Sequence, residues 1–123
     1  MDDCIFCKIV NEEIPTKFEW NDNEVVAFDD INPIAPVHIV IIPKRHIESL
    51  KEVKKEDVEL LGKIQKIASE LAGKKGIKDA FRVLTASGKG AGQTVFHLHY
   101  HLIGGWKDKA PEMEAGKDEQ ESE

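Results

Sequence analysis

Three of the five histidines of this chain fall within five residues, at His97, His99 and His101. Side chains alternate between the two faces of a β-strand, so this spacing predicts a strand with all three imidazoles on one face. Imidazole changes its protonation near neutral pH and suits proton transfer, metal binding or nucleophilic attack. Packing alone rarely places three histidines side by side. The row therefore indicates a functional site.

Two kinds of chemistry fit the row. Alternate histidines of a strand can converge on one metal ion. Alternatively, one imidazole attacks an electrophile, such as phosphorus or a carbonyl carbon, while its neighbours hold the target. The residues before the row favour the second chemistry. The glycine-rich segment 88–92 offers exposed backbone N–H groups for an anion, and Thr94 offers a hydroxyl donor.

Cys4 and Cys7 form an isolated Cys-x-x-Cys pair near the beginning of the chain. Such a pair can be redox-active, half of a metal site, or two small buried residues. A redox motif needs a thioredoxin-like βαβ context, which the sequence lacks. A tetrahedral zinc site needs two more ligands, for which His46 and His97 are the natural candidates. Four protein ligands would make such a zinc site structural.

The surrounding elements must position these residues. Runs of β-branched and aromatic residues predict strands at 17–20, 24–29, 37–42, 80–85 and 95–103. Residues 4–10 are expected to form a short helical turn, and apolar residues at three- and four-residue spacing predict one long helix over 58–72. This order indicates an α+β domain with a mainly antiparallel, five-stranded sheet and the long helix on one face. That helix would cover Leu98 and Tyr100 and leave the histidine face open. Phe96 and Leu102 are expected to point to the helix side as well.

Composition sets the remaining bounds. The chain has 123 residues and a net charge of −6, enough for one domain, expected over residues 1–106. Residues 107–123 carry seven acidic side chains against three lysines, which predicts a disordered acidic tail. No basic stripe argues for long nucleic acid, and no apolar run approaches the roughly 20 residues that span a membrane. With no signal-peptide pattern, a cytoplasmic location is expected.

The segment 92–103 resembles the His-x-His-x-His-x-x signature of the histidine-triad (HIT) family, and Gly104-Gly105 makes it most similar to the Hint branch, the purine nucleoside phosphoramidase type. The similarity continues upstream and covers roughly residues 4–105. Its matching segments are 5–6, 9–10, 28–33, 35–38 and 42–47.

The resemblance implies a nucleotide-binding homodimer that cleaves nucleoside 5'-phosphoramidates or acyl-nucleotides of the AMP or GMP type. His99 would be the nucleophile that forms a nucleotidyl-histidine intermediate. His101, Thr94 and backbone N–H groups around Gly92 and Gln93 would hold the phosphate. His38 would relay charge to the triad, and Asp30 would bind the ribose hydroxyls. The apolar base pocket would comprise Ile5, Phe6, Ile9, Ile31 and Val40. Some relatives with the cysteine pair bind zinc, here through Cys4, Cys7, His46 and His97.

The chain departs from the family pattern where many members carry an asparagine before the glycine loop, because it has Thr85-Ala86-Ser87. Ser87 is one candidate to supply the missing polar contact. The segment that crosses to the partner's site in some relatives is replaced by Trp106 and the tail. Three alternatives stay open: a dinucleoside polyphosphate hydrolase, a nucleotide-binding regulatory module, and a catalytic zinc hydrolase that uses all three histidines.

Overall fold

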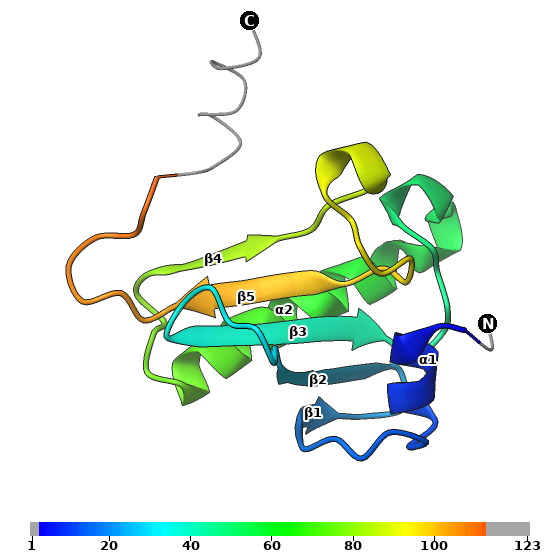
Figure 1. The fold of residues 1–123 in the computed structure, drawn as a ribbon, viewed down its shortest axis with the longest axis horizontal. Coiled ribbons are helices and arrows are strands. Elements are labelled where there is room, and N and C mark those ends of the chain that lie inside the picture. Colours follow the sequence, from blue (N-terminus) through cyan, green and yellow to red (C-terminus); the bar gives the residue numbers. More distant parts are fainter. Residues whose placement is uncertain (1–2, 113–123) are drawn as a thin grey trace, which may run out of the picture.

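The computed structural model describes residues 3–112, which form one antiparallel five-stranded sheet with helices against it (Figure 1). The strands lie in the order β1-β2-β3-β5-β4. Their bounds are Phe18–Asn21 (β1), Val25–Asp29 (β2), Val37–Pro43 (β3), Phe81–Leu84 (β4) and Tyr100–Gly104 (β5). The predicted α+β class and strand number are confirmed. The central strands β2, β3 and β5 are the most buried, because neighbours cover both of their edges.

Helix α2, Val58–Lys74, covers one face of the sheet. Its buried side chains recur at helical spacing and pack against Leu98, Tyr100 and Leu102, as the sequence predicts. Val58 was expected on this apolar stripe but is 61% exposed, because it is the first helical residue and lies at the edge of the contact. Covering this face of the sheet leaves the opposite one for the histidines.

Helix α1, Ile5–Val10, packs on part of the opposite face. Phe6 and Ile9 contact a second apolar cluster formed by Val26, Phe28, Val40 and Ile42. Cys4 is the N-cap residue of this helix, and its sulfur accepts a hydrogen bond from the N–H of Cys7. The expected N-terminal helical turn is therefore present, and it is anchored by its own cysteine pair.

The predicted strand over 95–103 is wrong in its first half. β5 begins only at Tyr100: its pairing with β4 stops at His101, opposite Leu84, and its pairing with β3 stops at Tyr100, opposite Ile41. The N–H of Leu98 donates instead to the carbonyl of Ile47, at 2.6 Å. His97 and His99 therefore precede the strand, and Phe96 is 43% exposed rather than packed beside Leu98.

Short 3₁₀ turns complete the structure: Leu50–Glu52 (η1), Lys55–Asp57 (η2) and Lys89–Ala91 (η3). Ser49 precedes η1, but its side chain makes no capping hydrogen bond. Residues 107–112 form neither helix nor strand, and most of the predicted acidic tail lies outside the described residues. Within residues 3–112 no helix is both long and apolar enough to cross a membrane.

Candidate functional site

An apolar cleft of 550 Å³ lies between α1 and the face of the sheet opposite α2. Phe6 and Ile9 of the helix form one wall, and Val40 of β3 contributes from the sheet. Phe28 packs edge-on against Phe6, with ring centroids 5.7 Å apart, and lines the same space. The predicted residues that line the cleft are Ile5, Phe6, Ile9, Asp30, Ile31, Val40 and Thr94.

His38 and His101 form a hydrogen-bonded pair next to Asp30, one of the residues that line the cleft. Their Nε2 and Nδ1 atoms are 2.8 Å apart, and Ile34 donates its N–H to Nδ1 of His38 at 3.1 Å. Because that nitrogen accepts, the neutral His38 carries its proton on Nε2 and donates to His101. His101 is then left with an N–H on its own Nε2. The Asp30 carboxylate lies 3.4 Å from His38 Nε2.

Both imidazoles of this pair are held neutral. Burial lowers the pKa of His101 to about 4, helped by the nearby His99 and His38 and opposed by Asp30. Burial also lowers the pKa of His38, again against the carboxylate of Asp30. At neutral pH His101 therefore acts as a hydrogen-bond donor without a positive charge.

His99 is buried, with 9% of its surface exposed. Its Nδ1 lies 2.7 Å from the carbonyl oxygen of His97. A carbonyl can only accept, so Nδ1 carries the proton and Nε2 keeps its free lone pair. Phe6 packs edge-on against the ring at 5.1 Å between centroids, and His101 lies at the same separation. This arrangement is suited to nucleophilic attack from Nε2.

The glycine-rich loop is organised by the buried side chain of Gln93. Its oxygen accepts the Gly88 N–H at 2.8 Å, and its nitrogen donates to the carbonyls of Glu48 and Val95. Gly88 and Gly92 both have φ of 98°, a backbone conformation that favours glycine. The N–H groups of Gly92 and Gln93, which the resemblance assigns to the phosphate, are already donated to the carbonyls of Lys89 and Gly88 within the loop. Neither residue lines the cleft, whereas Thr94 does.

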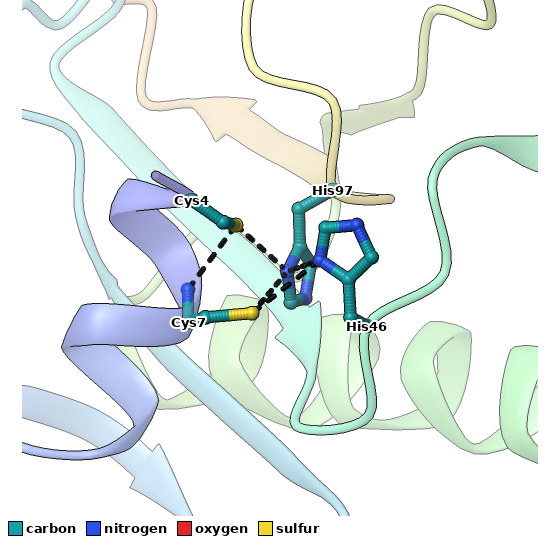
Figure 2. Close-up of side chains that lie close together, drawn as sticks. All are labelled: Cys4, Cys7, His46 and His97. Carbon is teal, nitrogen blue, oxygen red and sulfur yellow. Dashed lines mark hydrogen bonds between the residues drawn. The ribbon is translucent and has the colours of Figure 1, made fainter. Parts of the chain in front are cut away.

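Four side chains of types that bind metals converge at the N-terminal end of α1 (Figure 2). The Nδ1 of His97 lies 3.4 Å from the sulfur of Cys4 and 3.6 Å from that of Cys7. The Nδ1 of His46 lies 3.4 Å from the Cys7 sulfur and 3.2 Å from Nδ1 of His97. A tetrahedral zinc ion with usual bond lengths separates its ligand atoms by about 3.3–3.8 Å. The predicted set Cys4, Cys7, His46 and His97 therefore fits this ion.

The protonation of the cluster also suits a metal. His97 is fully buried, and its Nε2 lies 2.8 Å from the carbonyl of Pro43, which accepts the ring N–H and leaves Nδ1 facing the sulfurs. Burial lowers the pKa of His97 to about 4, so the ring is neutral. Burial and the adjacent Cys4 raise the pKa of the Cys7 thiol to about 11. A bound cation would reverse that effect and stabilise the thiolate.

The three histidines of the triad do not face one common point. His97 turns to the cysteines, whereas His101 joins Asp30 and His38. The 2.8 Å between His38 and His101 is a hydrogen-bond distance, shorter than the spacing of two nitrogens on one tetrahedral ion. This geometry speaks against a catalytic metal held by all three histidines.

Sequence reasoning missed Phe28 and Val95 in the cleft wall and the hydroxyl of Thr85, which contacts the carbonyl of His99. Alternation along β2 signals Phe28, because Val26 and Phe28 share the α1 side of the sheet. No local pattern identifies Val95 or Thr85.

Comparison with known proteins identifies the class. The family model described as "Scavenger mRNA decapping enzyme C-term binding" matches residues 3–115. Protein HitA of Neisseria gonorrhoeae is 49% identical over 104 residues, which are 85% of this chain and 97% of HitA.

Two solved structures agree with that match. A HIT family hydrolase from Clostridium thermocellum has a TM-score of 0.86 and 45% identity, covering 92% of this chain and 98% of its own. A histidine triad protein from Clostridium difficile has a TM-score of 0.84 and 41% identity, covering 91% and 98%. The fold and site thus define a histidine-triad domain, and the chain belongs to the HIT family.

Proposed function

We propose that this protein is a nucleotide hydrolase or transferase that cleaves nucleoside 5'-phosphoramidates or acyl-nucleotides of the AMP or GMP type. The observation that carries the proposal is the oriented His99. Its Nδ1 proton is committed to the His97 carbonyl, and its free Nε2 belongs to a ring packed against Phe6, which lines the apolar cleft. Similarity to proteins named HIT family hydrolases supports hydrolysis as the reaction.

In the proposed first step the lone pair of His99 Nε2 attacks the α-phosphorus. An N–P bond forms, and the bond from phosphorus to the leaving group breaks, its electrons leaving with that group. An acyl group leaves as a carboxylate, and an amine leaves with a proton taken from solvent. Water then attacks the same phosphorus and gives one proton to solvent, which releases the nucleoside monophosphate and returns the lone pair to His99. Transfer to another nucleophile would follow the same second step.

The residues around His99 are proposed to bind the phosphate and the nucleoside. His101 offers its Nε2–H to a phosphate oxygen, because His38 already donates to its other nitrogen. Thr94, on the cleft wall, offers a hydroxyl. Such fixed donors are most effective toward the charge that develops in the transition state. Asp30 would accept from the ribose hydroxyls, and the apolar cleft would take the base.

The test uses adenosine 5'-phosphoramidate with wild type and His99→Ala. We expect the variant to lose turnover while calorimetry records nearly unchanged AMP binding, because the nucleophile is removed and the cleft is kept. Mass spectrometry of quenched wild type should detect a nucleotidyl adduct on His99. Retained turnover in the variant contradicts the nucleophile assignment. Faster cleavage of dinucleoside polyphosphates, or tight binding without turnover, would favour the two alternative functions.

We also propose that Cys4, Cys7, His46 and His97 hold a structural zinc ion. The four ligand atoms lie within 4.8 Å of one another, and a closed set of four leaves no position for water. Zinc would fasten α1, and with it the cleft wall at Phe6, to the loop that carries His97.

Elemental analysis of protein purified without chelator tests the zinc proposal. We expect about one zinc per chain, and a fall to near zero in Cys7→Ser together with a lower melting temperature. Less than about 0.2 zinc per chain in the wild type would contradict a closed structural site. The melting temperature of the chelator-treated wild type provides the matched comparison.

The homodimer expected from the resemblance is part of the proposal. Among residues 3–112, β1 and β4 are the outer strands of the sheet, and each has one edge that no other described strand pairs with. Light scattering at micromolar concentration, giving twice the 13.8 kDa of the chain, is the expected result.

A further inference from the structure

The peptide that carries His99 lies outside the sheet. The pairing of β5 with β4 ends at His101 opposite Leu84, and its pairing with β3 ends at Tyr100 opposite Ile41. The backbone of His99 therefore lacks the ladder hydrogen bonds that hold a strand residue in place. A nucleophile needs a fixed position, so other contacts must supply it.

Three hydrogen bonds replace the ladder. The N–H of Leu98 donates to the carbonyl of Ile47 at 2.6 Å, and Nδ1 of His99 donates to the carbonyl of His97 at 2.7 Å. The third comes from a side chain: the hydroxyl of Thr85 donates to the carbonyl oxygen of His99 at 2.6 Å. Thr85 is the first residue after β4, so its hydroxyl takes the carbonyl at the point where backbone pairing stops.

We propose that Thr85 is a positioning residue for the nucleophile, holding the His99 carbonyl and thereby the peptide from which the imidazole projects. The inference rests on the proposed function of His99. It also gives a use to the segment Thr85-Ala86-Ser87, which departs from the family pattern: the polar group at its start serves the nucleophile's backbone rather than the substrate. Threonine suits this task, because its branched Cβ restricts the rotation of the hydroxyl.

The test compares Thr85→Val, which keeps the shape and loses the hydroxyl, with Thr85→Ser, which keeps the hydroxyl. We expect the valine variant to lose about 10- to 100-fold in the single-turnover rate of nucleotidyl transfer to His99, with KM changed less than about threefold, since small misplacements of a reacting group cost rates of this order. The serine variant should recover most of the rate. Zinc content and circular dichroism should match those of wild type in both variants.

A direct readout of the contact accompanies the kinetics. The carbonyl ¹³C resonance of His99 should move upfield in Thr85→Val and stay near the wild-type position in Thr85→Ser, because a hydrogen bond deshields the carbonyl carbon. If Thr85→Val does not fold, Thr85→Ala replaces it, with the same expectations.

Unchanged single-turnover rates in the hydroxyl-free variant overturn the inference, as does a rise in KM alone or a serine variant as slow as valine. Absence of turnover and of the adduct in wild type would refute the proposed function instead. In that case an unmoved carbonyl resonance would still overturn the Thr85 contact.

Discussion

The pair His38–His101 makes the stability of the fold depend on pH. His101 has a folded-state pKa of about 4 against 6.5 for an ordinary histidine. Because the folded-state pKa is the lower one, the unfolded chain binds a proton at His101 between about pH 6.5 and pH 4, and the folded chain does not. The contribution of the neutral ring to stability is therefore complete above pH 6.5 and is lost as the pH falls toward 4.

The size of the effect follows from the shift. One pKa unit corresponds to about 1.4 kcal/mol, so the full shift corresponds to about 3 kcal/mol. About 2 kcal/mol of this falls between pH 7 and pH 5. Because His101 is only partly shielded from water, we expect a measured loss of about 1–2 kcal/mol over that interval.

The assay is urea unfolding at a series of pH values, with wild type compared to His101→Asn. Asparagine retains an oxygen that can accept from His38 and carries no proton that titrates. All titratable groups other than His101 are the same in both proteins, so the difference between the two curves reports on His101. The free energy of unfolding of wild type should fall more steeply below pH 6.5. Parallel curves, or a steeper fall in the variant, would refute the argument.

Two further substitutions probe the scaffold. Gln93→Ala removes the partner of the Glu48 and Val95 carbonyls and of the Gly88 N–H, and should lower the free energy of unfolding by about 1–3 kcal/mol. Faster hydrogen exchange of the Gly88 amide would show that the loop has loosened. Unchanged exchange would contradict the role of Gln93 in holding the loop. Leu71→Ala opens a cavity in the core under α2 and should cost about 2–5 kcal/mol in urea unfolding while kcat stays near wild type, because α2 lies on the sheet face opposite the cleft. A tenfold drop in kcat would show that the two faces are not independent.

Much of the scaffold follows from local patterns. The apolar spacing in α2 and the β-branched run in β3 identify their elements within one or two residues, because periodicity reports directly on which face is buried. The alternation around His99 likewise separates Leu98 and Tyr100, which pack under α2, from the histidines. These outcomes depend on neighbours in the chain alone.

The strand predicted over 95–103 failed for the opposite reason. Its sequence alternates like a strand, but a strand also needs a paired neighbour, and the pairing with β4 and β3 stops at His101 and Tyr100. Hydrogen bonds to Ile47 and Thr85 hold the segment instead. These contacts join residues far apart in the chain, so no local pattern records them.

The sequence by itself determined the residue types of the candidate sites: an imidazole row, a cysteine pair and a glycine loop before a threonine. Only the tertiary structure decided which of these residues come together. Packing of α1 brings Cys4 and Cys7 against His97, and β3 brings His38 to His101. Hydrogen bonds then fix which nitrogen of each ring holds a proton, and that choice leaves His99 with a free lone pair. Spacing along the chain specifies neither the grouping of the residues nor the position of the ring protons, because both depend on which groups meet across the fold.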